Sequence, residues 1–255
     1  MRIEGATFLV TGSNRGIGRA IVGELAARGA HILAGTRSGA SHPDPSSSIV
    51  PVAMDLSSRE SIDASIDALA AHLPGIDGLV NNAGAFAAGQ LEHQDIDRIY
   101  ELFQANLVGL AHLTRRVLPA MLERGSGKIV NHASLVGYFN FPGISIYAAS
   151  KAGVTAFTES LRRELQGTGV TTLEIVTGGV DTDMLRSAAG DLQDHTSPKG
   201  WQWMDPTTWA ERIVDAIEND KHVLQPPGKA RLGKSLSAGP SFLLDAVAAR
   251  GFERR

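Results

Sequence analysis

The sequence has no cysteine, no long apolar run and no strong excess of charge of either sign. Without cysteine there is no disulfide framework and no thiolate chemistry, so we expect a reducing, cytoplasmic location. No stretch is long enough to span a bilayer, and the N-terminus lacks the apolar segment of a signal peptide. The net charge of -3 gives no general attraction to nucleic acids or anionic membranes, so we expect neither as a partner.

Metal-ligand spacing is absent too. The eight histidines are scattered and form no H-x-x-x-H pair, so we expect no metal site. The chain has no linker-like segment and no internal repeat. At 255 residues, 43% of them hydrophobic, it can bury one full core, although length alone would also allow two small domains. We therefore expect a single domain over residues 1–255.

A tyrosine and a lysine, Tyr147 and Lys151, stand four residues apart in a segment with helical periodicity. At 3.6 residues per turn they share one face of a helix. A cation beside a phenol favours the phenolate, so we expect Lys151 to lower the pKa of Tyr147 and make it a general acid or base. By itself, the pattern also fits a surface tyrosine beside a solvated lysine.

A glycine-rich turn follows the first apolar segment. Residues 5–10 are β-prone, residues 11–18 read TGSNRGIG, and residues 19–28 have helical periodicity. Strand, glycine turn and helix in this order predict a dinucleotide site. Gly12 permits a tight turn, Gly16 lets the backbone approach a pyrophosphate, and Gly18 lets the helix lie close to the strand. A plain turn would use one glycine and seldom three.

Apolar strand segments alternate with amphipathic helical segments along the rest of the chain. The predicted strands are residues 30–36, 49–54, 75–81, 128–133, 170–176 and 222–224. The predicted helices are residues 59–72, 95–123, 147–166 and 206–218. This order predicts an α/β fold with a doubly wound, mostly parallel sheet and helices on both faces. A ligand then binds at the carboxyl ends of the strands.

Four motifs occur in a fixed order: T-G-x-x-x-G-x-G, then N-N-A-G at residues 81–84, then Ser134 and Y-x-x-x-K. With them the chain resembles the short-chain dehydrogenase/reductase family, in its single-domain branch, over about residues 5–224. The resemblance implies a Rossmann-type oxidoreductase that transfers a hydride between a nicotinamide cofactor and an alcohol or ketone. One position departs from the family pattern, since Thr177 stands where the family has proline.

The resemblance also implies four catalytic residues: Asn106, Ser134, Tyr147 and Lys151. Tyr147 would exchange the proton and Ser134 would fix the carbonyl oxygen. Lys151 would also hold the nicotinamide ribose, and Asn106 would order a water chain to the solvent. Taken singly, Ser134 also fits a turn cap, and Asn106 fits a polar residue inside a helix.

Charge at the end of the second strand predicts the choice of cofactor. NAD sites usually place an acid there, whereas a 2′-phosphate needs cations. Here the strand ends in Thr36 and Arg37, and Arg15 can face the same corner, so we expect NADP first and NAD second, although each arginine alone fits an ordinary surface charge. Asp55 is expected at the adenine ring but also fits a capping role beside Ser57. The cofactor residues expected from motif and resemblance are Gly12, Ser13, Asn14, Arg15, Gly16, Ile17, Gly18, Thr36, Arg37, Asp55, Leu56, Asn82, Ala83, Gly84, Tyr147, Lys151, Gly178, Val180 and Thr182.

The substrate pocket is expected to be mostly apolar. The residues that suggest this lie between the catalytic serine and tyrosine or follow the N-N-A-G motif: Phe86, Leu135, Val136, Tyr138, Phe139, Phe141 and Ile144. Residues 183–204 contain Met184, Leu185, Trp201 and Trp203 and resemble the family's mobile substrate lid. A fixed hydrophobic contact explains these tryptophans equally well.

A C-terminal extension, residues 226–255, follows the last predicted strand. Leu243, Leu244, Val247 and Ala248 fall at helical spacing in it and form a short apolar stripe. Packing on its own domain, a subunit interface and, last, a membrane surface are the three ways to cover that stripe. The family's usual dimer does not need this tail, so we expect a homodimer or homotetramer.

Two other functions fit parts of the sequence. A dinucleotide-binding sensor or scaffold would use the fold without turnover, and loss of catalytic residues would be its signature. An epimerase or dehydratase of the extended branch shares Y-x-x-x-K but normally adds a C-terminal sugar-nucleotide domain, for which this chain is too short.

Overall fold

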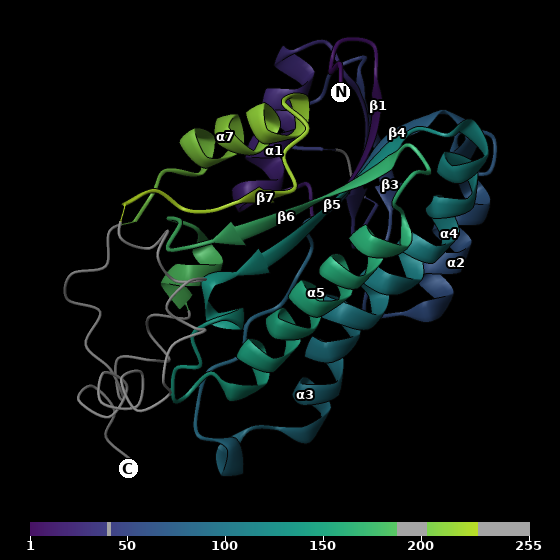
Figure 1. The fold of residues 1–255 in the computed structure, drawn as a ribbon. Coiled ribbons are helices and arrows are strands. Elements are labelled where there is room, and N and C mark those ends of the chain that lie inside the picture. The colour runs from purple at the N-terminus through teal and green to yellow at the C-terminus, as the bar shows by residue number, and fades with distance from the viewer. Residues whose placement is uncertain (40–41, 188–202, 229–255) are drawn as a thin grey trace.

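The computed structural model describes residues 1–39, 42–187 and 203–228. Within these residues seven strands form one sheet in the order β3-β2-β1-β4-β5-β6-β7, and every neighbouring pair is parallel (Figure 1). The strands are β1 Thr7–Thr11, β2 His31–Thr36, β3 Ile49–Ala53, β4 Ile76–Asn81, β5 Gly127–Ser134, β6 Val170–Thr177 and β7 Val223–Leu224. The predicted α/β sheet is confirmed, and it is parallel throughout.

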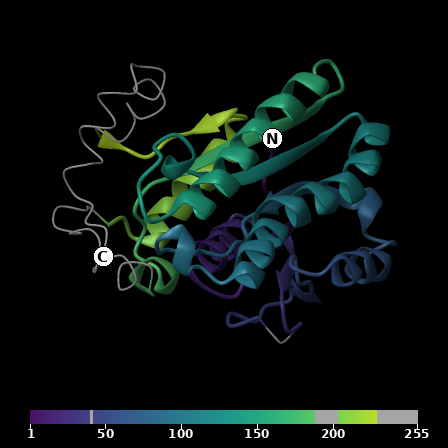
Figure 2. The same cartoon turned by 90° about the horizontal axis from the view of Figure 1, so that it is seen from below.

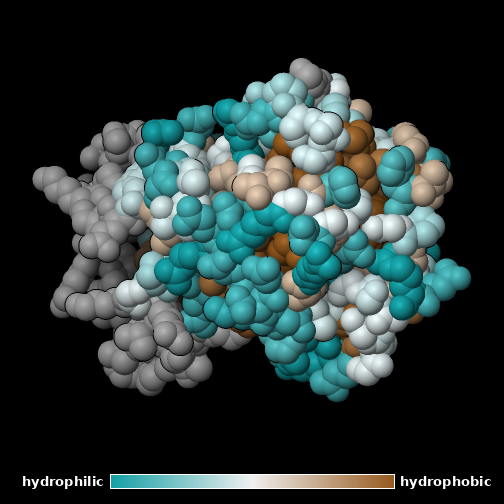
Figure 3. Space-filling model, turned by 90° about the horizontal axis from the view of Figure 1, so that it is seen from above, coloured by the Kyte–Doolittle hydropathy of each residue, from teal (hydrophilic) through white to brown (hydrophobic). Residues whose placement is uncertain are grey.

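Helices cover both faces of the sheet (Figures 1 and 2). They are α1 Gly16–Ala27, α2 Arg59–Ala68, α3 Ile96–Phe103, α4 Gly109–Arg124, α5 Ser145–Glu164 and α7 Pro206–Glu218. Helices α1 and α7 lie side by side on one face, and α2, α4 and α5 lie on the other. The surface at the top of Figure 1 is mostly hydrophilic, with apolar side chains in small separate areas (Figure 3).

The core consists of two apolar layers, one on each face of the sheet. Along β1, Phe8 and Val10 pack into the layer under α1 and α7, which also holds Trp209, and Leu9 packs into the layer under α2 and α4. Side chains of a strand alternate between faces, and here both faces are buried. This is why the first strand reads as a continuous apolar run.

The winding of the chain reverses at β1, which lies between β2 and β4. The loops that leave the carboxyl ends of these strands diverge at such a point and open a crevice for a ligand. Gly12 follows β1 there with a φ of +63°, and Asn82 follows β4. The fold therefore places the glycine-rich turn and the N-N-A-G motif at one end of the sheet.

The helix predicted over residues 95–123 is not continuous. It consists of α3, a π-helical turn at Gln104–Val108 and α4. At Gly109 an ideal Cβ would lie 2.4 Å from the carbonyl oxygen of Leu56, so the helix passes very close to the loop after β3. The π turn contains Asn106, and π turns inside α-helices are frequent at functional sites.

Most of the predicted lid and tail lies outside the described residues. Of residues 183–204 only 183–187 and 203–204 are described, and of residues 226–255 only 226–228. Among the described segments no helix is long and apolar enough to cross a membrane. In that same part of the chain, no three histidine or carboxylate side chains gather as a metal-binding group.

Candidate active site

The glycine-rich turn is packed so closely that only glycine fits at two positions. An ideal Cβ at Gly12 would lie 2.9 Å from the Cα of Ala83, and one at Gly18 would lie 2.1 Å from the carbonyl oxygen of Gly12. Arg15 precedes α1 without a side-chain cap, and the first turn of α1 holds no acidic residue. The backbone N–H groups and positive end of the helix dipole therefore suit a phosphate, as the sequence predicts.

A buried histidine that sequence reasoning missed holds this turn. His42 Nε2 lies 2.8 Å from the carbonyl oxygen of Ser13, and His42 Nδ1 accepts from the backbone N–H of Asp44. The hydroxyl of Ser13 donates to the carbonyl oxygen of Gly35. Hydrogen bonds therefore hold both the backbone carbonyl and the hydroxyl of Ser13. His42 lies in a polar loop, and nothing in the local sequence distinguishes it from a solvated residue.

The corner at the end of β2 has the character that a 2′-phosphate requires. Thr36 is buried, and its hydroxyl has no hydrogen-bond partner within the described residues. Arg15 and Arg37 are exposed, and neither forms an ion pair in the described part of the chain. The nearby carboxylate of Asp44 is neutralised by a two-fold contact with Arg19 at 2.7 Å. The local field is therefore positive.

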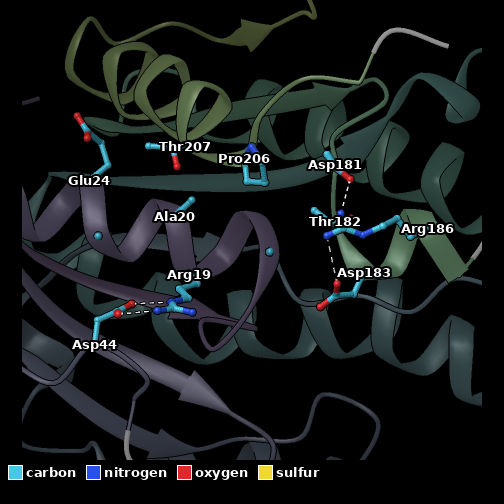
Figure 4. A pocket seen from close by; sticks show the side chains of 12 residues that line it. Arg19, Ala20, Glu24, Asp44, Asp181, Thr182, Asp183, Arg186, Pro206 and Thr207 are labelled. Carbon is cyan, nitrogen blue, oxygen red and sulfur yellow. Dashed lines mark hydrogen bonds and ion pairs between the residues drawn. The ribbon is translucent and has the colours of Figure 1, made fainter. Parts of the chain in front are cut away.

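A pocket of about 440 Å³ lies next to the glycine-rich turn, between α1, the loop after β6 and the start of α7 (Figure 4). The Arg19–Asp44 pair stands at one side of it, and Arg186 contacts Asp181 and Asp183 at the other. These pocket arginines are thus already paired. None of the four predicted catalytic residues lines the pocket, so it is not where the reacting carbon of a substrate would lie.

The loop after β4 packs against the glycine-rich turn. Asn82 donates from Nδ2 to the carbonyl oxygens of Thr11 and Gly12, at 3.0 and 3.2 Å, so its amide holds the turn. Asp55 accepts from the backbone N–H and the hydroxyl of Ser57, which is the alternative role considered above. Whether Asp55 also meets the adenine ring stays a prediction.

The loop after β6 reaches back to the same turn. An ideal Cβ at Gly16 would lie 3.2 Å from the Cγ2 of Thr182. Val180 forms a parallel bridge with Met204, and the backbone of Asp181 donates to the carbonyl oxygen of Met204 at 2.9 Å. Two ends of the predicted lid are therefore tied together beside the phosphate end of the site.

Tyr147, Lys151 and Ser134 come together at the carboxyl end of β5. The Nζ atom of Lys151 is 5.9 Å from the ring centroid of Tyr147 and donates to the backbone carbonyl of His132 at 2.7 Å. The ring of Phe86 packs on Tyr147 with centroids 4.7 Å apart. The sequence prediction that the tyrosine and lysine share one helix face thus holds.

The expected direction of the tyrosine pKa is wrong. Burial raises the pKa of Tyr147 to about 12, and a hydrogen bond with Ser134 offsets only part of this effect. Burial also lowers the pKa of Lys151 to about 8. The ammonium donates to the carbonyl of His132, and burial, not the charge of Lys151, dominates the pKa of Tyr147. Tyr147 is therefore protonated at neutral pH.

Asn106 is buried and all its polar atoms are occupied. Its Oδ1 accepts from the backbone N–H of Ala85 at 2.7 Å, and its Nδ2 donates to the carbonyl of Ala85 and the hydroxyl of Ser150. An ideal Cβ on Gly84 would lie 3.1 Å from Asn106 Oδ1 and 3.7 Å from Lys151 Nζ. The π turn thus brings Asn106 against both the N-N-A-G loop and α5.

The segment between Ser134 and Tyr147 holds apolar side chains and one tyrosine with a polar contact. Phe139 and Phe141 lie 6.3 Å apart, and Ile144 is buried. Tyr138, however, points its hydroxyl at the buried carboxylate of Glu174 at 2.8 Å. Burial and this carboxylate raise the pKa of Tyr138, so it stays neutral. Tyr138 is therefore bound to the sheet, and the sequence gives no sign of this because its partner is 36 residues away.

A family model of short chain dehydrogenases matches residues 6–193. The chain belongs to the short-chain dehydrogenase family. It is 36% identical to 3-oxoacyl-[acyl-carrier-protein] reductase FabG of Vibrio cholerae, over 73% of this chain and 78% of that protein. It is 33% identical to ketoacyl reductase HetN of Nostoc sp., over 85% of this chain and 77% of that protein.

A solved short-chain dehydrogenase from Burkholderia cenocepacia, in complex with NADP, has a similar structure. It gives a TM-score of 0.84 with 26% sequence identity, and the match covers 97% of this chain and 99% of the other. The family and fold predicted from the sequence are confirmed. As a short-chain dehydrogenase, the protein is an oxidoreductase, and nothing in these comparisons supports the sensor or scaffold alternative.

Proposed function

We propose that the protein reduces a ketone to an alcohol by transferring a hydride from NADPH, and catalyses the reverse reaction under opposite conditions. The observation that carries the proposal is the gathering of Ser134, Tyr147 and Lys151 at the end of β5, beside Gly84. Relatives that are ketoacyl reductases support this reaction class.

The glycine-rich turn, the start of α1 and the residues at the end of β2 fit NADP. Gly12, Gly18 and the start of α1 suit the pyrophosphate, because a side chain at either glycine would collide with backbone. Arg15 and Arg37, which are exposed and form no ion pair with any described residue, suit the 2′-phosphate. A structural relative that holds NADP agrees with this choice. When bound, the cofactor supplies the hydride.

In this proposal Tyr147 donates the proton to the carbonyl oxygen as the carbonyl carbon receives the hydride. Its high pKa keeps the proton in place at neutral pH until the oxygen becomes basic enough to take it. When substrate binds, the hydroxyl of Ser134 turns away from the carbonyl of Thr177, which is 3.4 Å away, and donates a second hydrogen bond to that oxygen. Lys151 holds the cofactor ribose, and Asn106 fixes the start of α5 through Ser150 and thereby positions Tyr147.

Phe86 packs on Tyr147, and the segment between Ser134 and Tyr147 contributes the aromatic pair Phe139 and Phe141, so we propose a mostly apolar substrate side. An apolar ketone or a 3-oxoacyl thioester therefore fits the site better than a sugar or a charged acid. We further propose that the chain acts as one domain in the cytoplasm.

The oligomer is proposed to be at least a homodimer. Ile96 in α3, Tyr100 in α3 and Val108 in the π turn are 61%, 72% and 50% exposed. Several exposed apolar side chains along one helical segment are typical of a surface that another subunit covers.

The purified protein tests the proposal in a nicotinamide absorbance assay with a panel of apolar ketones and a 3-oxoacyl thioester. We expect oxidation of NADPH with at least one of them, and a much lower rate with NADH at equal concentration. Tight binding of NADPH without turnover of any carbonyl compound would favour the scaffold alternative, and equal rates with NADH would contradict the cofactor assignment.

A further inference from the structure

Four polar side chains form a continuous chain of hydrogen bonds across the proposed cofactor site. Asn82 follows β4, His132 lies near the end of β5, Thr177 ends β6 and Trp209 is in the first turn of α7. His132 Nδ1 is 3.0 Å from Asn82 Oδ1, and Trp209 Nε1 is 3.1 Å from Thr177 Oγ1. His132 Nε2 and Thr177 Oγ1 are also hydrogen-bonded. Among the four, His132, Thr177 and Trp209 are buried.

The chemistry of the groups fixes the direction of every bond in this chain. Asn82 Nδ2 faces two backbone carbonyls, so its Oδ1 faces His132 and can only accept. His132 Nδ1 must therefore carry hydrogen, which leaves Nε2 as the acceptor. Trp209 Nε1 can only donate to Thr177 Oγ1, so the threonine hydrogen points to His132 Nε2. One neutral tautomer of His132 satisfies all four side chains.

The Asn82 end of the chain, and the backbone of His132 and Thr177 within it, hold groups of the proposed site. Asn82 donates to the carbonyl of Gly12 in the glycine-rich turn. The carbonyl of His132 accepts from Lys151 Nζ at 2.7 Å. The carbonyl of Thr177 accepts from the hydroxyl of Ser134 at 3.4 Å. A proline at position 177 would have no hydroxyl for either neighbour, so the threonine found there is the residue that joins them.

We propose that His132 and Thr177 are a positioning pair, which holds the carboxyl ends of β4, β5 and β6 in register and thereby sets the affinity for NADP(H). The inference rests on the proposed function. Burial keeps the ring neutral, since it lowers the pKa of His132 to about 3, with a smaller contribution from the charge of Lys151. The pair is not needed merely to fill space, because two apolar residues of similar size would fill it without burying three side-chain polar atoms.

The test compares Thr177→Val, Thr177→Ser and Thr172→Val. Thr177→Val keeps the shape and removes the hydroxyl, whereas Thr177→Ser keeps the hydroxyl. Thr172 is a matched control, because it lies in the same strand and is buried, and its hydroxyl has no partner in the described part of the chain. The dissociation constant of NADPH is measured by fluorescence titration, and the KM values of NADPH and of the ketone are measured separately.

We expect Thr177→Val to raise the dissociation constant and the KM of NADPH on the order of tenfold, with little change in the KM of the ketone. Thr177→Ser and Thr172→Val should behave like the wild type. An unchanged affinity in Thr177→Val overturns the inference, and so does an equal loss in Thr172→Val. A wild-type protein that fails to bind NADPH contradicts the proposed function itself, which is a separate result.

A measurement on the wild-type protein decides the matter if Thr177→Val does not fold. NMR of ¹⁵N-labelled histidine, assigned through the backbone, reports the ring tautomer of His132. We expect the neutral form with hydrogen on Nδ1, and a shift of that signal when NADPH saturates the protein. Hydrogen on Nε2, or a signal that NADPH leaves unchanged, overturns the inference.

Discussion

Among single residues, we propose that those at the end of β2 determine which cofactor binds. Arg37 is exposed and forms no ion pair with any described residue, so its charge is available to a 2′-phosphate. A charge-assisted hydrogen bond contributes about 1.5–3 kcal/mol. We therefore predict that Arg37→Ala weakens the binding of NADPH by about 10- to 100-fold and leaves NADH binding unchanged, as measured by fluorescence titration with each cofactor.

Arg115→Ala is the control for this prediction. Arg115 is also exposed and forms no ion pair within the described residues, but it lies in α4, on the opposite face of the sheet from α1. Arg115→Ala changes the net charge by the same amount as Arg37→Ala. If Arg115→Ala weakens NADPH binding as much as Arg37→Ala does, the effect is a general one of charge and the assignment of Arg37 is wrong.

His132 predicts how stability depends on pH. Its pKa in the folded protein is about 3, and the ordinary value is 6.5. Between these values the unfolded chain binds the proton and the folded protein does not, so stability falls as the pH falls from 6.5 towards 3. Relative to His132→Gln, which cannot titrate, the wild type should lose up to about 1.4 kcal/mol per pH unit in that window.

Urea unfolding of both proteins at pH 7, 6, 5 and 4 measures this difference. Other titrating groups are common to the two proteins and cancel in the comparison. If the free energy of unfolding changed equally with pH in the two proteins, His132 would titrate normally in the folded protein and would not be a buried neutral ring.

At the scale of elements, the contact between α1 and the glycine-rich turn depends on Gly18. Its ideal Cβ would lie 2.1 Å from the backbone oxygen of Gly12, so α1 must shift to admit a side chain. We predict that Gly18→Ala lowers NADPH affinity at least tenfold, because a small displacement of a positioning element is costly. Calorimetry with NADPH measures the affinity.

Gly23→Ala is the matched substitution in the same helix. A Cβ at Gly23 would meet nothing within 4 Å, and alanine favours a helix over glycine by about 1 kcal/mol. Gly23→Ala should therefore raise the melting temperature and leave NADPH affinity unchanged. Loss of affinity in Gly23→Ala would show that α1 tolerates no substitution, and the argument from the close contact at Gly18 would fail.

The elements themselves were predictable, because their signals are local. The strand and helix order follows from periodicity, and α7 begins and ends at the predicted residues, where Asp205 and Pro206 give a clear helix start. The π turn was not predictable, since its sequence QANLV has ordinary helical periodicity. It is accompanied by the close approach of Gly109 to the carbonyl of Leu56, a tertiary contact.

The candidate site was predictable only as far as its motifs extend. Tyr147 and Lys151 stand one helical turn apart in the sequence, so it could be predicted that they share a helix face. The bond between His132 and Thr177 joins residues 45 positions apart, and it depends on the pairing of β5 with β6. The pKa of Tyr147 was mispredicted for a related reason, because burial depends on the whole fold and outweighs the nearby charge.

At the scale of the whole molecule, the exposed apolar side chains of α3 predict association. Tyr100 is 72% exposed, and a charge at its place would oppose burial in an interface. We predict that light scattering finds at least a dimer for the wild type and a monomer for Tyr100→Asp. Val50→Asp is the control, since Val50 is 49% exposed on the edge strand β3 and should leave the dimer intact. A monomeric wild type would contradict the prediction.

The central claim is that Tyr147 supplies the proton for a hydride transfer from NADPH. Tyr147→Phe keeps the ring that packs on Phe86 and removes only the proton donor. The most direct measurement therefore compares this variant with the wild type in NADPH binding and in turnover of an accepted ketone. We expect an unchanged dissociation constant for NADPH and a fall in kcat of about 10²- to 10⁴-fold. Near-normal turnover by Tyr147→Phe would contradict the central claim.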